Sequence, residues 1–292
     1  MPELPEVETI ARTLSPQIKD RVIDAVHVLL PKTLAAGNDL LAEVFPARIL
    51  GVRRRGKLLL LDVDGGYVLA FHLKMTGRLF VHGENEAPGK HTKVVFDIAA
   101  EPGKPAARLF FDDARTFGFC RLMRPEDLPA WPFWKKLGPE PLTLGKDAFI
   151  TAFKGRRGAI KALLLDQAMV AGIGNIYADE ACFRTGIRPD SPACALSDAL
   201  LAALLENVQA VLTESIAECG SSIRDYRDAN GDAGAFQNLF RVYGRAGQPC
   251  LTCGTTLEKK TVAGRTTVFC PHCQKQVAIN PIPALRGSGP NR

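Results

Sequence analysis

Two cysteine pairs close to the C-terminal end constrain the fold most strongly. Cys250 and Cys253 form one C-x2-C pair, and Cys270 and Cys273 form a second pair after 16 intervening residues. Four thiolates at this spacing suit tetrahedral zinc, because a tight turn can supply each pair. Since all four positions are cysteine, the spacing predicts one structural Zn2+ ion and not a catalytic one.

The segment between the two cysteine pairs has the pattern of a β-hairpin. The run "TTLEKKTVAGRTTVF" predicts two strands that turn at Ala263-Gly264, with Arg265 at the tip. Two interpretations stay open at this point: a finger that contacts DNA, or a zinc knuckle that only stabilises a small subdomain. His272 lies inside the second pair, and we expect it on the surface and not as a metal ligand.

The composition is that of a globular protein. A length of 292 residues suggests two domains, and the net charge of +6 weakly favours a polyanionic partner. No apolar run reaches the roughly 18–20 residues of a membrane span, and the first residues lack the layout of a secretory signal. We therefore expect a cytoplasmic chain without membrane contact, in which paired cysteines favour metal over disulfides.

The pattern of apolar residues changes along the chain from strands to helices. Residues from about 20 to 125 show short apolar runs broken by Gly-containing turns, which is typical of strands. Further along, "LSDALLAALLENVQAVLTESIAECG" has the spacing of a helix, with Ser197 as its expected N-cap and Gly220 as its expected C-cap. This order predicts an α+β fold with two domains. The expected segments are a catalytic β domain at 1–130, a linker at 131–145, a helical domain at 146–241, a zinc finger at 242–278 and a disordered tail at 279–292.

A glycine-rich turn marks a possible phosphate site in the helical part. "AGIGNIYADEA", from Ala171 to Ala181, predicts a helix, a tight turn and a second helix that starts at Asn175. Backbone amides at a helix start and an Asn side chain can hold a phosphate, although a plain connection between helices explains the same pattern. Upstream, a basic stretch fits an electrostatic footprint for DNA: Lys154, Arg156, Arg157 and Lys161.

Three short motifs in the strand region also carry polar groups that could bind DNA. "RRRGK" (residues 53–57) precedes a strongly apolar strand, and "HLKMTG" (residues 72–77) places His72 and Met75 where a strand meets a turn. In "DDARTFGF", Arg115 and Phe117 are two positions apart, which places them on one face of a strand. An Arg and an exposed Phe there could enter a DNA stack, whereas core packing is the alternative for Met75 and Phe117.

The first residues, "MPELPEVET", concentrate proline and glutamate where chains usually tolerate change. They form either a solvated helix start or a terminus that takes part in chemistry. Removal of Met1 would expose the secondary amine of Pro2. An α-amino group has a pKa of about 7.7–8.0, against about 10.4 for lysine, so it needs little tuning to act as a nucleophile. Nearby glutamates could then move protons at a sugar oxygen.

Taken in order, these motifs resemble the bacterial formamidopyrimidine-DNA glycosylase family from residue 1 to about 275. The motifs are "MPELPEVET", "RRGKLLLL", "FHLKMTGRL", "DDARTFGF", "LGPEPL", "AGIGNIYADEA", "RVYGRAGQPC" and the four-cysteine finger. The resemblance implies an N-terminal β-sandwich flanked by helices, then a helical domain with a helix–two-turn–helix motif and a zinc finger, with DNA in the cleft between the domains. It also implies a monomeric repair enzyme that excises oxidised purines such as 8-oxoguanine and formamidopyrimidines, then cleaves the abasic strand by β,δ-elimination.

The resemblance assigns roles to individual residues. Pro2 corresponds to the nucleophile, Glu3 to the acid/base, Glu6 to a glutamate near the flipped nucleotide, and Lys57 to a lysine that contacts phosphate beside the lesion. Asn175 and Arg265 correspond to two further phosphate contacts, and His72 to a residue near the DNA cleft. Met75, Arg115 and Phe117 correspond to the trio that fills the gap left by the flipped base.

The chain departs from the family pattern at several positions. Lys74 stands where many relatives have a small residue, and Thr116 where a basic residue is frequent. Within the segment that resembles the loop over the flipped base, Ala235 replaces an aromatic residue and Leu239 an acidic one. Two alternatives stay open: an endonuclease VIII-type enzyme for oxidised pyrimidines, against which Leu4 argues, and a non-catalytic binder of damaged DNA, against which Pro2, Glu3 and Lys57 argue.

Overall fold

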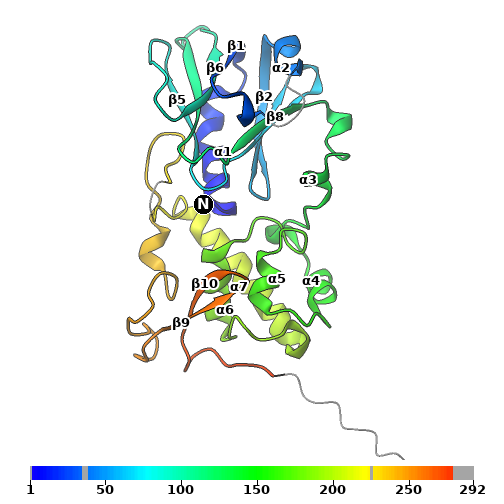
Figure 1. Ribbon diagram of the computed structural model, residues 1–292, viewed down its shortest axis with the longest axis vertical. Coiled ribbons are helices and arrows are strands. Elements are labelled where there is room, and N and C mark those ends of the chain that lie inside the picture. Colours follow the sequence, from blue (N-terminus) through cyan, green and yellow to red (C-terminus); the bar gives the residue numbers. More distant parts are fainter. Residues whose placement is uncertain (1, 35–38, 224–225, 279–292) are drawn as a thin grey trace, which may run out of the picture.

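The computed structural model describes residues 2–34, 39–223 and 226–278 of the chain. The expectations about Met1 and about the tail at 279–292 concern residues outside this part. A sheet domain stands above a helical domain, and the N-terminus lies at the junction of the two (Figure 1). The architecture is the predicted α+β fold, with the zinc finger attached to the helical domain.

The sheet domain contains eight antiparallel strands in the order β5-β7-β6-β1-β2-β3-β4-β8. Only two residue pairs join β1 to β2, so the sheet divides there into two four-stranded halves. Phe71 on β4 makes edge contacts with Phe96 on β6 and Phe111 on β7, at ring-centroid distances of 5.7 and 5.5 Å. The halves therefore face each other across one core, which is the predicted sandwich. The strands are β1 (Val22–Val28), β2 (Ala47–Arg55), β3 (Leu58–Val63), β4 (Val68–His72), β5 (Gly77–Gly83), β6 (Thr92–Ile98), β7 (Ala107–Asp113) and β8 (Phe119–Met123).

Helix α1 (Leu4–Ile18) carries the N-terminus to the domain junction. Val7, Ile10 and Leu14 lie on one face of the helix and are buried in the core of the sandwich, as the 3.6-residue period requires. Leu4, at the first turn, instead packs into the core of the helical domain. Pro5 lies in the same first turn, where its missing N–H costs nothing. One short helix thus touches both domains.

The Pro-rich segment after β8 packs closely against the sheet. Trp131 is buried with Leu58 and Leu60 of β3, and Phe133 and Trp134 of the short helix α3 (Pro132–Lys135) cover the same cluster. Trp131 and Phe133 stack at 5.1 Å between centroids. The segment thus covers the outer face of β3, β4 and β8 before it enters the helical domain. The sheet domain also carries the short helix α2 (Asp39–Val44).

The helical domain is built around α7 (Asp198–Ala217), which packs against α6 (Asn175–Thr185) and α4 (Lys146–Phe153). Helix α5 (Ile160–Leu165) precedes α6 and packs against it. The Ser197 hydroxyl accepts from Leu200 N at 3.2 Å, which confirms the predicted N-cap. The predicted C-cap at Gly220 is wrong by two residues: the cap is Glu218, and Cys219 and Gly220 follow with left-handed backbone.

By length and composition alone, α7 could cross a membrane. Its apolar residues instead form the middle of the helical core: Leu201, Leu204, Leu205, Val208, Val211 and Leu212 are buried there against Phe149, Tyr177 and Phe236. Glu206 and Glu214 on the remaining face pair with Lys146 and Arg184. The helix is therefore the core helix of a globular domain.

The finger contains β9 (Glu258–Val262) and β10 (Arg265–Phe269), joined at Ala263-Gly264 as predicted. Ala263 and Gly264 have φ angles of 49° and 69°, which is the backbone of a tight two-residue hairpin turn. Leu257 and Val268 pack beside the cysteines in a small core of their own. The hairpin lies on the helical domain beside α6 (Figure 1).

Candidate active site and nucleic-acid interface

The residues after Met1 are seated between the two domains. Pro2 is buried, and Glu3 is the N-cap residue of α1, whose backbone N–H donates to Glu6 Oε2 at 2.8 Å. The next amide, Leu4 N, donates to the carbonyl of Gly172 at 3.0 Å. Gly172 belongs to the segment between α5 and α6, so the start of α1 is bonded to the helix–two-turn–helix motif.

Glu3 is a buried carboxyl with one free oxygen. Its Oε1 accepts from Ile176 N at 3.2 Å, whereas Oε2 has no hydrogen-bond partner among the described residues. Burial raises the Glu3 pKa to about 7, although the nearby Lys57 cation works in the opposite direction. At neutral pH both protonation states of Glu3 are therefore populated, which suits a group that must give and take protons.

Lys57 occupies the turn between β2 and β3. Gly56 precedes it with φ of 57°, and the Lys57 ammonium donates to the carbonyl of Ile173 at 2.9 Å. Burial lowers the Lys57 pKa, and the Glu3 and Glu6 charges oppose that shift. Glu3 and Lys57 thus come from different parts of the sheet domain and meet on the same turn, between Gly172 and Ile176.

The predicted basic cluster before Lys57 is neutralised by carboxylates. Arg53 pairs with Asp62 at 2.8 Å, and Arg54 pairs with both Glu8 and Glu140. Glu140 Oε1 also accepts from Arg55 Nη1 at 3.0 Å and from Gly56 N at 2.5 Å. This cluster fixes the hairpin that presents Lys57. Glu8 therefore has a structural role, as the helix-start interpretation predicts.

Glu6 is buried in a polar network that reaches the helical domain. Its Oε1 accepts from the Tyr177 hydroxyl, from Ser221 N at 2.8 Å and from Ser221 Oγ at 3.0 Å. The Tyr177 hydroxyl also lies 2.7 Å from Ser215 Oγ on α7. Ser221 opens the segment that resembles the loop over the flipped base. Glu6 therefore links the N-terminus to that segment.

His72 ends β4 and is held as a neutral ring. Burial, with Lys74 and Lys57 as further causes, lowers its pKa to about 3. Nδ1 accepts from the backbone N–H of Lys74 at 3.0 Å, so in the neutral ring Nε2 carries the proton. Phe133 and Phe119 flank the ring at 5.4 and 5.6 Å between centroids. His72 can therefore offer a neutral N–H donor.

Met75, Arg115 and Phe117 lie together on the surface. Met75 is 41% exposed and Phe117 is 55% exposed, so core packing is not their role. Arg115 Nη1 lies 3.2 Å from Met75 Sδ, and its guanidinium sits over the Phe117 ring at 5.0 Å. The prediction that Arg115 and Phe117 lie on a strand is wrong, because β7 ends at Asp113 and both residues follow in the turn to β8. We call these three residues the wedge.

Asp113 supports the wedge, and sequence reasoning missed it. Its buried carboxylate accepts from the Thr76 hydroxyl, from Arg115 N at 3.2 Å and from Gly118 N at 2.6 Å. Thr76 follows Met75, so one carboxylate binds both loops that carry the wedge. The only signal in the sequence was a second Asp at the end of a strand, which many turns share.

Asn175 begins α6, as predicted, and it touches the finger. Its Nδ2 donates to the carbonyl of Thr266 at 3.0 Å, and its Oδ1 has no partner among the described residues. Thr266 follows Arg265, which is exposed beside the hairpin turn. The two predicted phosphate contacts therefore lie close together, and both lie near Lys57, whose pKa the Arg265 charge helps to lower.

The basic stretch predicted as a DNA footprint is partly structural. Lys161 is fully buried and pairs with Asp179 of α6 at 2.6 Å. Its ammonium also donates to Thr267 Oγ1 of β10 at 2.6 Å, and Asp179 Oδ2 accepts from Val268 N at 3.1 Å. Lys154 pairs with Asp198 on the surface. The buried pair attaches the finger to the helix–two-turn–helix motif.

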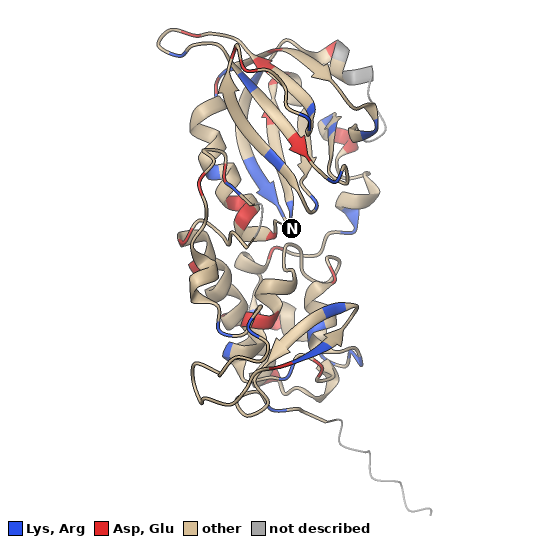
Figure 2. Cartoon of the chain, turned by 60° about the vertical axis from the view of Figure 1, so that its left-hand side comes forward, with Lys and Arg blue, Asp and Glu red and all other residues tan. Residues whose placement is uncertain are grey.

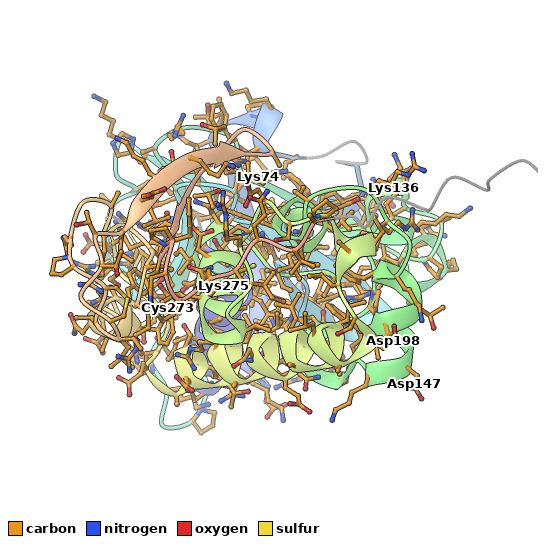
Figure 3. The ribbon with its side chains drawn as sticks, turned by 90° about the horizontal axis from the view of Figure 1, so that it is seen from below. Lys74, Lys136, Asp147, Asp198, Cys273 and Lys275 are labelled. Carbon is orange, nitrogen blue, oxygen red and sulfur yellow. The ribbon has the colours of Figure 1, made fainter. Side chains whose placement is uncertain are left out.

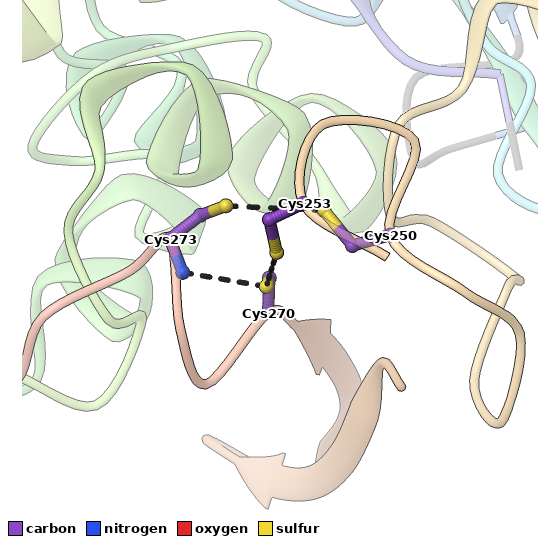
Figure 4. A group of neighbouring side chains, drawn as sticks. All are labelled: Cys250, Cys253, Cys270 and Cys273. Atoms are coloured by element: carbon purple, nitrogen blue, oxygen red, sulfur yellow. Dashed lines mark hydrogen bonds between the residues drawn. The ribbon is translucent and has the colours of Figure 1, made fainter. Parts of the chain in front are cut away.

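The four cysteines form one cluster that fits a metal ion. Their Sγ atoms all lie within 4.8 Å of one another, and the separations are 3.9 Å for Cys250–Cys273 and 3.5 Å for Cys253–Cys270 (Figure 4). Sulfur atoms bound tetrahedrally to zinc at about 2.3 Å lie about 3.8 Å apart. The donor set suits one structural Zn2+, and His272 is exposed and outside the cluster, as predicted.

Basic side chains mark the face where these groups meet. Lys and Arg lie on the sheet strands just above the N-terminus and on the β9–β10 hairpin below it (Figure 2). Segments rich in Lys and Arg from both domains thus border the junction that holds Glu3 and Lys57. Such a distribution attracts a phosphate backbone across the two domains.

Comparison with known proteins places the chain in a family. Family models match residues 1–120 (formamidopyrimidine-DNA glycosylase N-terminal domain), 137–227 (the H2TH domain of the same glycosylase) and 247–276 (a zinc finger found in FPG and IleRS). A formamidopyrimidine-DNA glycosylase from Desulfitobacterium hafniense is 44% identical over 284 residues, covering 94% of this chain and all of that protein. The chain belongs to the formamidopyrimidine-DNA glycosylase family.

Other members of the formamidopyrimidine-DNA glycosylase family extend the comparison. One from Nitratidesulfovibrio vulgaris is 62% identical over 214 residues, which are 73% of this chain but only 57% of that relative. The Lactococcus lactis enzyme, solved with DNA that contains Fapy-dG, has a TM-score of 0.87 and 33% identity, covering 94% of this chain and all of that one. The same enzyme with abasic-site DNA gives a TM-score of 0.86.

Proposed function

We propose that this member of the formamidopyrimidine-DNA glycosylase family excises oxidised purines from double-stranded DNA through a Schiff base on Pro2. It then cleaves the abasic strand by β,δ-elimination. The observation that carries the proposal is the meeting of Glu3 and Lys57 on the turn between Gly172 and Ile176, directly after Pro2. A proton carrier, a cation and the terminal residue are thereby gathered where the two domains join.

The chemistry begins once Met1 has been removed, because only then is the Pro2 nitrogen a secondary amine. That nitrogen attacks C1′ of the damaged nucleotide, the bond from C1′ to the base breaks, and the base leaves with the electron pair and takes up a proton. Opening of the sugar at O4′ then gives an iminium between C1′ and the Pro2 nitrogen. The iminium is an electron sink, so loss of a C2′ proton expels the 3′ phosphate, and a second elimination expels the 5′ phosphate.

Glu3 supplies the protons in this scheme. In its protonated form it gives a proton to O4′ as the sugar opens, and the carboxylate that remains can accept a proton in the elimination steps. A carboxyl with a pKa of about 7 can do both near neutral pH. The unpartnered Oε2 is the atom free to make this contact. Lys57, beside it, is assigned to the phosphate next to the lesion.

The remaining site residues hold and deform the DNA. Asn175 and Arg265 are assigned to the phosphate backbone, and His72 offers a neutral N–H donor to the same strand. The wedge fills the gap in the stack when the damaged nucleotide is flipped out, because an empty gap would cost stacking energy. The exposure of Met75 and Phe117 supports this role. Together these assigned contacts hold duplex DNA at the domain junction without reading its sequence.

Lesion preference is assigned to the segment from Ser221 to Arg245, which we call the capping segment. Glu6 holds its first residue, and Leu239 in its short helix is 44% exposed. We expect substitution of Leu239 by Asp to change 8-oxoguanine excision more than cleavage of a pre-formed abasic site, because only the first reaction needs contacts to the base. Equal losses with both substrates would contradict this assignment.

An endonuclease VIII-type preference for oxidised pyrimidines remains the second candidate. It is favoured by one observation: the Lactococcus lactis enzyme has been solved with DNA that contains an oxidised pyrimidine. That complex was formed by the Lactococcus lactis enzyme, and similarity to that enzyme is what supports the candidate for this chain. We further infer that the protein acts on DNA in the bacterial cytoplasm, associated with the nucleoid, and works as a monomer.

Borohydride trapping on matched duplexes tests the proposal. We expect a covalent adduct on 8-oxoguanine DNA, weaker trapping on thymine glycol DNA, and a weaker adduct in Pro2→Gly. Stronger trapping on thymine glycol would favour the second candidate, and no adduct on either would overturn both. Glu3→Gln should block excision of 8-oxoguanine and spare cleavage of a pre-formed abasic site. Intact mass reports in parallel whether Met1 has been removed.

A further inference from the structure

Lys74 is a cation at the junction proposed to face the DNA. Its ammonium lies 5.7 Å from the centre of the Phe119 ring and 5.8 Å from that of Phe133. Among the described residues, no carboxylate pairs with it. The two rings attract the ammonium without neutralising it, so its full charge remains available to a ligand.

The backbone at Lys74 adopts a conformation that is unfavourable for lysine. Its φ is 50°, in the left-handed region where glycine is preferred. The turn is nevertheless closely fixed, because Lys74 N donates to His72 Nδ1 and Gly77 N donates to the Leu73 carbonyl at 2.8 Å. Strained backbone that the surroundings hold in place is concentrated at functional sites. A lysine at a position suited to glycine implies a use for its side chain.

The neighbours of Lys74 define what its ammonium can reach. His72 lies two residues before it on the same aromatic pair, and Met75 of the wedge follows it directly. His72 is neutral and can give a phosphate a hydrogen bond but no charge. Lys74 supplies the missing positive charge beside that donor. Lysine acts on phosphate as a point charge, which needs no fixed fork geometry.

We propose that Lys74 contacts a backbone phosphate of the DNA next to the nucleotide that the wedge displaces. This inference rests on the proposed function, since it assumes that the junction holds duplex DNA. The contact anchors the loop that carries Met75 to the DNA backbone. It is insensitive to base identity, because a phosphate carries no sequence information. It adds one phosphate contact to those assigned to Lys57, Asn175 and Arg265.

The salt dependence of DNA binding tests the contact directly. Each phosphate neutralised by a cation contributes about 0.9 to the slope of log affinity against log salt. Binding of a duplex with an uncleavable tetrahydrofuran site should therefore show a slope lower by about 0.9 in Lys74→Met. The ratio of wild-type to variant affinity should shrink about 3.5-fold between 50 and 200 mM salt. Lys74→Arg should keep the wild-type slope.

Two matched variants separate a charge contact from other causes. Met75→Ala removes the adjacent wedge residue, which has no charge, so it should weaken binding without changing the slope. Lys146→Met is the distant control, because it removes a lysine on α4 next to Asp147. Asp147 lies on the other side of the molecule from Lys74 (Figure 3). The slope of Lys146→Met should equal that of the wild type. An equally low slope in Lys146→Met would mean that the effect is general and not local, which would overturn the inference.

Two further measurements separate the role of Lys74 from effects on folding and from the proposed function. Lys74→Gly also removes the charge but relieves the left-handed strain, so it should lower the slope while the melting temperature stays equal or rises. An unchanged slope in both Lys74→Met and Lys74→Gly overturns the contact. If wild-type protein does not trap on 8-oxoguanine DNA under borohydride, the proposed function fails. If the wild-type protein traps normally and the salt slopes of Lys74→Met and Lys74→Gly equal the wild-type slope, only the role of Lys74 fails.

Discussion

The carboxylate of Glu3 lies directly against the Cα of Gly174. A Cβ added at Gly174 would lie 2.2 Å from Glu3 Cδ and 2.4 Å from its Oε1, far inside contact distance. Gly174 is the N-cap of α6 with φ of −133°, an extended conformation that alanine adopts freely. Its lack of a side chain therefore makes room for Glu3 and is not needed for the turn.

Gly174→Ala should therefore displace the Glu3 carboxyl. We expect the single-turnover rate of 8-oxoguanine excision to fall at least about 100-fold, the lower end of what a positioned proton carrier contributes. Gly145→Ala is the matched control, because Gly145 is also an N-cap and nothing lies within 4 Å of the added Cβ. A Gly174→Ala rate within a few-fold of wild type would contradict the proposed position of Glu3.

The raised Glu3 pKa predicts a pH-dependent cost in stability. The folded protein holds the Glu3 proton up to about pH 7, whereas the unfolded chain loses it near the ordinary value of 4.5. Stability from this group therefore falls as the pH rises from 4.5 to 7. Glu3→Gln should gain about 2–3 kcal/mol relative to wild type between pH 5 and pH 8, measured by urea unfolding.

Glu8→Gln serves as the control for that experiment. Hydrogen bonds from Arg12 and Arg54 lower the Glu8 pKa below its ordinary value, although burial alone would raise it. The contribution of Glu8 is therefore complete above pH 5 and is lost only in more acidic solution. Its variant should lose a constant amount of stability between pH 5 and pH 8. A constant difference for Glu3→Gln as well would contradict the raised pKa.

Asp113→Asn should loosen the wedge without touching the reacting groups. An amide cannot accept hydrogen bonds at both of its terminal atoms, so one loop loses its partner. Hydrogen bonds to a charged group contribute about 1.5–3 kcal/mol, which corresponds to a loss of roughly 10–100-fold in 8-oxoguanine excision. Asp127→Asn, at an exposed position, is the control. The melting temperature distinguishes a loosened loop from global unfolding.

Removal of the metal should weaken DNA binding and leave the helices intact. The cysteines hold the ends of the hairpin that carries Arg265, while the Lys161–Asp179 pair keeps β10 on α6. We expect chelation to lower affinity for tetrahydrofuran DNA at least tenfold, with recovery on addition of Zn2+ and little change in far-UV circular dichroism. Cys219→Ser, at an exposed cysteine outside the cluster, should retain one zinc per chain.

The sequence predicted those parts of the fold that depend on local signals. The hairpin turn at Ala263-Gly264, the N-cap at Ser197 and the start of α6 at Asn175 each follow from residue types at fixed spacing. The cysteine cluster follows from spacing as well. These features were predictable because neighbouring residues determine them.

Contacts between distant parts of the chain were not predictable in the same way. Lys161 reads as a surface cation in a basic stretch, and only the fold brings Asp179 to it in a buried site. In the sequence, Asp113 indicates only the end of a strand. Its role in supporting the wedge could not be predicted, because its hydrogen-bond partners come from two separate loops. In the sequence, Gly174 indicates only a tight turn, whereas in the structure its missing side chain makes room for Glu3. In each case the partner lies outside the window that local patterns cover.

The hydrogen bonds between Glu6 and Ser221 have a consequence for folding during translation. Glu6 is among the first residues to leave the ribosome, but Ser221, whose N–H and hydroxyl it accepts, comes 215 residues later. At about 5–20 residues per second, the terminus waits roughly 10–40 seconds before its partners exist. Ile176 reaches Glu3 only late in the same interval. Until translation has passed the capping segment, the nascent chain therefore carries Glu6 without its partner Ser221, and the proposed site assembles only afterwards.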